Sequence, residues 1–189
     1  MDSREAIERF EKAAEQSDER EQFGRRVAVL VAVSAALLAV ASLSGNRFAE
    51  QAVLDQARAS DAFNEYQANS LKLHINEDTT AVLTLLGKGT PNEAAAKAAA
   101  DKLVAANQAK YQPNKDRLLP KARGYVAAQE RAEAQHRVVQ FSEAALQLTI
   151  VLLSISIITR SRLLVGGAGI VGAAGALLLL DGQFLFWAL

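Results

Sequence analysis

Hydrophobic and polar residues are segregated into long blocks along this chain. No Asp, Glu, Lys or Arg occurs at residues 27–46, 144–159 or 163–180, whereas charged residues are dense elsewhere. A bilayer core of about 30 Å needs about 20 helical residues, and each block is close to that length. The pattern predicts an all-α membrane protein with three transmembrane helices, at 27–46, 142–159 and 163–180.

The first block has an alternative interpretation as a cleaved signal peptide, because residues 39–41 (Ala-Val-Ala) offer an A-x-A cleavage site. Residues 1–26 are polar and acidic and form a longer stretch than a usual n-region, which favours an uncleaved signal anchor. They also predict an amphipathic arm, with Ile7, Phe10 and Ala14 on one face.

Basic residues near the blocks predict the orientation. Arg25 and Arg26 precede the first block, and Arg160 and Arg162 occupy the short link between the second and the third. With three spans, both clusters fall on one side, and the positive-inside rule makes that side cytoplasmic. We expect the N-terminus inside, and residues 47–141 and the C-terminus outside.

The C-terminal segment, residues 181–189, is predicted to lie at the membrane interface. Asp181 marks the far end of the third block and is expected to face headgroup water. Phe184, Phe186 and Trp187 follow it and are typical of an interfacial aromatic belt.

Residues 47–141 predict an antiparallel helical hairpin, in which 47–73 pairs with 115–141 through stripes of small and aromatic residues. The stripes recur every seven residues, as in a coiled coil: Ala52, Ala59, Tyr66 and Leu73, with an offset stripe of Ala49, Gln56, Phe63 and Ser70, and Leu118, Tyr125, Ala132 and Val139 on the returning helix. We expect packing by the large members of these stripes, namely Phe63, Tyr66, Leu73, Leu118, Tyr125 and Val139.

Two polar segments, residues 76–80 and 112–113, predict breaks, so that residues 74–114 would form a separate helical tip. Within the tip, Thr90 is the expected N-cap of a new helix, with Pro91 at its first position and Glu93 completing a capping box. The preceding Gly-Lys pair lacks the spacing of a phosphate-binding loop.

The third block is crowded with small residues, which allow helices to approach closely in lipid. Gly169, Gly172 and Gly175 recur every three residues, and Ala168 stands four before Gly172. Three uses remain open: packing on the chain's own second span, contact between protomers, or a pore lining.

Composition excludes several chemistries. The formal net charge is zero, with 21 basic and 21 acidic residues, so no overall field attracts nucleic acid. Cysteine is absent and only two histidines occur, which removes thiolate chemistry and leaves little material for a metal or cofactor site. No ionisable residue lies within the three uncharged blocks, which argues against a proton relay. We expect no enzymatic activity and no cofactor.

Residues 59–72, placed after an Arg-Arg-led first span, resemble an uncharacterised bacterial membrane-protein family of unknown function. The resemblance implies an N-terminal span, a helical extramembrane region and a C-terminal helical pair.

The preferred interpretation is a non-enzymatic scaffold or accessory subunit of the bacterial cytoplasmic membrane. It would assemble with itself or with a larger membrane complex through the glycine-rich span and the hairpin. The alternative is a small homo-oligomeric channel lined by the Gly/Ala face of the third span.

Overall fold

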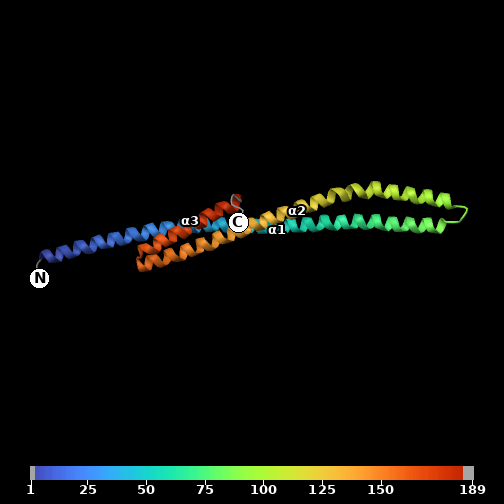
Figure 1. The fold of residues 1–189 in the computed structure, drawn as a ribbon. Coiled ribbons are helices and arrows are strands. Elements are labelled where there is room, and N and C mark those ends of the chain that lie inside the picture. Colours follow the sequence, from blue (N-terminus) through green and yellow to red (C-terminus); the bar gives the residue numbers. More distant parts are fainter. Residues whose placement is uncertain (1–2, 185–189) are drawn as a thin grey trace. The chain divides into compact units, whose positions relative to one another are not determined.

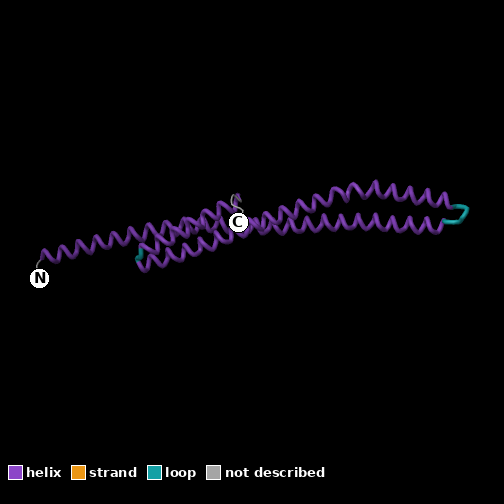
Figure 2. The backbone as a smooth tube through the Cα atoms, in the orientation of Figure 1, coloured by secondary structure: helices purple, strands orange, loops and turns teal. Residues whose placement is uncertain are grey.

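The chain folds entirely into α-helices in the part that the structure, a computed structural model, describes. It describes residues 3–184, with side chains from Asp18 onward. Within that range the chain forms α1 (Ser3–Gly87), α2 (Glu93–Thr159) and α3 (Arg162–Phe184) (Figures 1 and 2). The predicted all-α class is confirmed. The apolar face expected on the N-terminal arm, and Phe186 and Trp187 of the aromatic belt, lie outside the described side chains.

All three helices are, by length and composition, apolar enough to cross a membrane. Their outward faces carry large exposed apolar side chains, among them Val33 on α1, Ile158 on α2 and Ile170 on α3. Such continuous apolar surface is unfavourable in water. The prediction of three helices suited to a bilayer is therefore confirmed at the level of composition.

The helices contribute to two compact units, and α1 and α2 each belong to both. The three-helix unit comprises Met1–Ala49 and Glu133–Leu189, and the hairpin unit comprises Glu50–Ala132. The predicted extramembrane segment, 47–141, thus shares residues 47–49 and 133–141 with the three-helix unit.

Two apolar clusters hold the three-helix unit together, and each takes residues from all three helices. One joins Ala41, Val139, Leu146 and Leu179, and the other joins Val27, Leu153 and Ala168. After the short link at Arg160 and Ser161, α3 folds back along α2 (Figure 1). Val139, predicted to pack in the hairpin, belongs instead to this core.

The hairpin unit turns between Gly87 and Glu93. Gly89 has φ +74°, a left-handed conformation that glycine adopts without steric cost. Its N–H donates to the Glu93 carboxylate at 2.9 Å, and the Asn92 N–H donates to Thr90 Oγ1 at 3.3 Å. The predicted turn is confirmed, but α2 begins at Glu93, not at Pro91. Glu93 binds the Gly89 N–H rather than that of Thr90, because the left-handed glycine presents its N–H to the carboxylate.

Cation–π contacts define the pairing of α1 and α2 in the hairpin. The Lys115 ammonium lies 5.5 Å from the ring centroid of Tyr66, and that of Lys72 lies 5.2 Å from the centroid of Tyr111. The predicted pairing placed Lys115 opposite Leu73 and Lys72 opposite Asp116. The register expected from equal segment lengths is therefore wrong by five to seven residues, about one and a half to two turns. The turn at Gly89 sets the register, because both helices run uninterrupted to it.

One seven-residue repeat accounts for most of the protected positions of α1 from Gly24 to Gly87. Every member of two series spaced by seven is buried or half-buried. The first series is Gly24, Val31, Leu38, Gly45, Ala52, Ala59, Tyr66, Leu73, Thr80 and Gly87, and the second is Val27, Ser34, Ala41, Phe48, Asp55, Ala62, Asn69 and Asn76. A strict repeat of seven is the period of a left-handed supercoil.

The second series differs from the predicted offset stripe by one residue. Asp55 and Ala62 are 3% and 5% exposed, whereas Gln56 is exposed and Phe63 is only half-buried. Small side chains allow close helix approach, so Ala62 occupies the centre of the contact and the larger Phe63 lies beside it. The predicted stripes with Leu73 and with Leu118 do face the hairpin contact: Leu73 and Leu118 are buried, and Tyr66 and Tyr125 are half-buried. Val139 is the exception, since it lies in the other unit.

The predicted breaks at 76–80 and 112–113 are wrong, and with them the separate tip. Asn76 Nδ2 donates to the Lys72 carbonyl at 2.6 Å, and Thr79 Oγ1 donates to that of Ile75 at 2.7 Å. These polar side chains bond to the helix they belong to, so they do not end it. Pro113 and Pro120 lie inside α2 on its exposed side, where the carbonyls that they leave without an N–H partner can reach water.

Candidate helix-association surfaces

Part of the small-residue face of α3 packs against α2. A Cβ at Gly172 would lie 3.0 Å from Thr149 Cγ2, and one at Gly175 would lie 3.2 Å from Ala145 Cβ. Ala168 is fully buried, in the cluster with Val27 and Leu153. The pair predicted from sequence, Ala168 and Gly172, therefore serves packing inside the three-helix unit.

The opposite side of α3 has small residues with no neighbour. A Cβ at Gly166 or at Gly169 would meet no heavy atom within 4 Å. Ala173, four residues after Gly169, is also exposed. We call Gly166, Gly169 and Ala173 the open face. Of the residues predicted for helix association, Gly169 alone belongs to it, and Ala173 is its small partner at the spacing that membrane helices use.

A polar cluster joins the three helices at the end of the unit where α3 ends. His136 Nδ1 lies 2.9 Å from the Gly45 carbonyl oxygen, and Gln140 Nε2 lies 2.9 Å from His136 Nε2. A carbonyl can only accept, so Nδ1 donates to Gly45, while Nε2 faces the side-chain amide of Gln140. Gln183 of α3 donates to Ser44 Oγ of α1.

The polar cluster is a hydrogen-bonded clamp between helices. A Cβ at Gly45 would lie 3.1 Å from Glu143 Oε1 and 3.4 Å from Val139 Cγ1, so α1 and α2 approach closely at this glycine. Asp181 is only 8% exposed, so the expectation that it faces headgroup water is wrong. The reason is that α3 continues to Phe184, which turns Asp181 toward the unit.

The two histidines lie in different units. His74 belongs to the hairpin unit and contacts Glu77 at 3.4 Å, whereas His136 belongs to the polar cluster. Within the described residues, no group of three or more His, Asp or Glu side chains could hold a metal ion.

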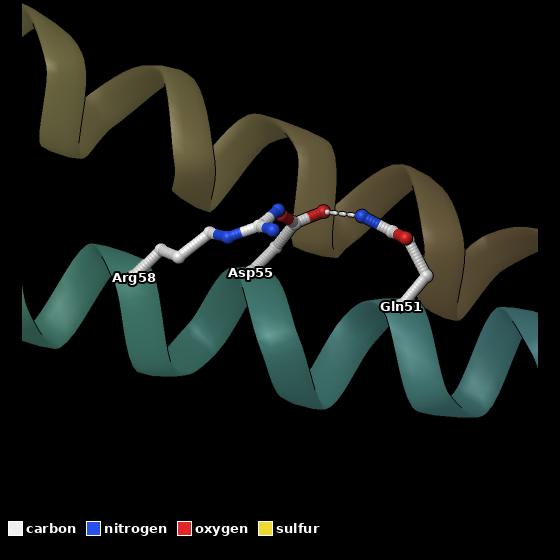
Figure 3. A network of polar contacts seen from close by, with 3 residues as sticks. All are labelled: Gln51, Asp55 and Arg58. Carbon is white, nitrogen blue, oxygen red and sulfur yellow. Dashed lines mark hydrogen bonds and ion pairs between the residues drawn. The ribbon is translucent and has the colours of Figure 1, made fainter.

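A carboxylate lies in the core of the hairpin. Asp55 is 3% exposed, on the side of α1 that faces α2 (Figure 3). It accepts hydrogen bonds from Gln51 Nε2 at 2.8 Å and from an Arg58 guanidinium nitrogen at 3.1 Å. Its partners lie one turn before and after it, so α1 itself stabilises the buried charge.

Apolar residues also project from the hairpin near its turn, away from α2. We call them the outer row: Leu71, Ile75, Val82 and Leu86, which are 60, 54, 54 and 72% exposed. Spacings of four and seven place them on one side of α1, opposite the two buried series. Sequence reasoning missed this row because the predicted break at 76–80 assigned Ile75, Val82 and Leu86 to a separate tip and divided them from Leu71.

The arginines predicted to set the topology lie at one end of the three-helix unit. Arg26 of α1 and Arg162 of α3 line one cavity, and Arg25 pairs with Glu21 at 3.1 Å. Arg160, in the link, has φ +53°, a left-handed conformation that is uncommon for a residue with a side chain.

Comparison with known proteins gives a family and no activity. Neither the curated proteins nor the solved structures contain a match to this chain. A family model described as a domain of unknown function, DUF4337, matches residues 23–185. The match spans all three apolar helices and the hairpin, and it agrees with the resemblance to a family of unknown function. The chain therefore belongs to the DUF4337 family.

Proposed function

We propose that the protein is a non-enzymatic scaffold or accessory subunit of the bacterial cytoplasmic membrane, in which copies associate through the open face of α3. The proposal rests on a difference between two pairs of glycines on α3. Gly172 and Gly175 pack closely against α2, whereas Gly166 and Gly169 have open space around them. A glycine costs helix stability, and close packing between helices in lipid offsets that cost.

The proposed orientation places the N-terminus inside and the hairpin and C-terminus outside. Its support is the position of Arg25, Arg26, Arg160 and Arg162 at one end of the uncharged blocks. The hairpin would then present the outer row to the aqueous phase, where exposed apolar side chains gain most from being covered by another protein.

The non-enzymatic part of the proposal is supported by composition. The chain has no cysteine, and its two histidines are in separate units. The buried side chains of Ser142 and Asp55 are engaged in a helix-to-helix and a within-helix hydrogen bond, respectively.

Disulfide cross-linking tests the association, and the absence of native cysteine makes each introduced thiol unique. Ala173→Cys in membranes should give an oxidised dimer. The matched control is Ala168→Cys, which puts the same side chain on the buried side of the same helix and should remain monomeric. Equal cross-linking of both variants would refute association through the open face. So would the absence of cross-linking in both variants together with a one-protomer mass by light scattering. Ion flux in liposomes that Gly169→Leu abolishes would indicate a channel instead.

Labelling of introduced cysteines by a membrane-impermeant maleimide tests the orientation. We expect Thr90→Cys, in the hairpin turn, to react in spheroplasts. Ser161→Cys, in the link, should react only after lysis. The reverse pattern would invert the topology while leaving the association intact.

A further inference from the structure

A cavity of about 540 Å³ lies at the end of the three-helix unit where α3 begins. Its walls combine two kinds of side chain from α1 and α3. Phe23, Val27, Leu30 and Val165 are apolar, and Arg26 and Arg162 are cationic. This mixture is what a molecule with a charged head and an apolar body requires.

The cavity lies where charged sequence gives way to uncharged sequence. Arg26 immediately precedes the uncharged block 27–46, and Arg162 immediately precedes the block 163–180. If these helices cross a bilayer, as the proposed function holds, this junction is at the level of the lipid headgroups. The apolar walls then extend toward the acyl chains.

The two arginines are suited to binding a phosphate. A guanidinium group presents planar, forked N–H donors that match phosphate oxygens. Both side chains are exposed, and among the described side chains neither forms an ion pair, whereas the neighbouring Arg25 pairs with Glu21. The two guanidinium groups come from different helices, so a phosphate between them would join α1 to α3.

The remaining polar residues narrow the ligand class. Glu19 and Gln22 also line the cavity, on the side of Arg26 away from the uncharged block. Two arginines and one glutamate leave one net positive charge, which a single phosphodiester balances. A carboxylate and an amide can bond to hydroxyl groups of a polar head beyond the phosphate.

We propose that the cavity binds one anionic glycerophospholipid with a hydroxylated head, of the phosphatidylglycerol class. Its phosphodiester lies between Arg26 and Arg162, and its glycerol head faces Glu19 and Gln22. Its upper acyl methylenes contact Leu30 and Val165, which lie on the side of the arginines toward the uncharged blocks. This inference needs the three helices to cross a bilayer, but it needs neither association through the open face nor a particular orientation.

Native mass spectrometry of the full chain in a mild detergent tests the proposal. Phosphatidylglycerol and phosphatidylcholine of identical acyl chains are titrated, with inorganic phosphate as the free anion. We expect one phosphatidylglycerol per protomer, bound about tenfold more tightly than phosphatidylcholine. The double variant Arg26→Gln/Arg162→Gln should lose that preference. Arg47→Gln, which removes an exposed arginine at the other end of the first block, should bind like the wild type.

A second variant keeps both charges and removes the space. Leu30→Trp puts a larger side chain on the apolar wall at a position that is already 43% exposed, so the fold should tolerate it. It should weaken phosphatidylglycerol binding with unchanged helical content by circular dichroism.

Three results would overturn the proposal. They are equal binding of the two lipids, a double variant that binds like the wild type, or displacement of the lipid by inorganic phosphate at equal concentration. The first would indicate general solvation by lipid, and the last a free-anion site. If Ala173→Cys fails to cross-link while phosphatidylglycerol still binds, the proposed association is refuted and the lipid site is retained.

Discussion

Ser142 of α2 donates a hydrogen bond of 2.7 Å to the carbonyl oxygen of Gly175 on α3, and both residues are buried. The contact requires glycine, because a side chain at Gly175 would meet Ala145 and Leu146 of α2 at 3.2 Å. Small residues let the helices approach, and the approach brings a backbone carbonyl within reach of a hydroxyl. Packing and hydrogen bonding thus act together in fixing the rotation of α3.

Ser142→Ala should destabilise the three-helix unit by about 1 kcal/mol, because a buried interhelical hydrogen bond is lost. The measurement is thermal unfolding in detergent, followed by circular dichroism. The matched control is Ser154→Ala on the same helix. Ser154 is exposed and bonds only to the Ile150 carbonyl of its own helix, so its loss should have little effect. Equal shifts for the two variants would mean that the interhelical bond contributes nothing.

The glycines of α3 should respond to alanine in opposite directions. A Cβ at Gly182 would lie 2.6 Å from Val139 Cγ2 and 3.4 Å from the Val139 backbone nitrogen, so α2 and α3 would have to separate. We expect Gly182→Ala to cost about 1–3 kcal/mol, as overpacking does.

Gly166→Ala is the matched comparison, since open space surrounds that position. Alanine is the better helix former, so this variant should stabilise the protomer by up to about 1 kcal/mol. The same unfolding experiment measures both variants. A loss of stability at Gly166 would indicate that the open face is already in contact with another molecule.

The sequence predicted the presence of the helices better than their ends. Uncharged blocks and the repeat from Ala52 to Leu73 are strong signals, because burial against lipid or against a partner helix leaves a direct trace in residue type. Segments with turn-forming composition led to wrong predictions of helix breaks. Asn76 and Thr79 bond to carbonyls of their own helix, and Pro113 faces water, so none of them ends a helix. Propensity at such positions is a weak prior that packing along the rest of the hairpin overrides.

The rotation of each helix was harder to predict. The second series on α1 contains Asp55 and Asn69, which are polar, and so the larger Phe63 suggested a row one residue away. Continuing the count of seven back to Val27 would have located the second series, because the same repeat runs through the apolar block. On α3, spacing alone could not show that Gly172 packs on α2 whereas Gly169 does not. The side of α3 that faces α2 depends on contacts such as the one between Ser142 and Gly175.

Replacing Asp55 by leucine should stabilise the hairpin and weaken its register. A buried carboxylate has a desolvation cost that a well-packed apolar residue avoids, commonly by about 1–4 kcal/mol. The partner Arg58 side chain is 53% exposed and can return to water. Both partners of Asp55 lie on α1, so its effect on the register depends on which α2 side chains pack against the buried carboxylate. An apolar leucine accepts more of these alignments than a polar core residue does.

Two measurements examine these effects separately. The unfolding temperature should rise, and spin-label distances between α1 and α2 should broaden. Gln56→Leu, at the neighbouring exposed position, controls for added hydrophobicity. A narrow distance distribution in Asp55→Leu would show that the apolar members of the repeat suffice for the register.

Arg160 combines a backbone strain with a charge, and two substitutions separate them. Its φ of +53° is sterically unfavourable for a residue with a Cβ and is readily adopted by glycine. Arg160→Gly should therefore stabilise the α2–α3 link by about 1 kcal/mol, whereas Arg160→Lys keeps the strain and the charge and should be neutral.

If the basic cluster directs the topology, Arg160→Gly should also increase the fraction of chains with an inverted link, measured by maleimide labelling of Ser161→Cys. Lower stability in Arg160→Gly would show that the arginine side chain contributes contacts outweighing the strain. Arg160 would then act in the folded unit as well as in insertion.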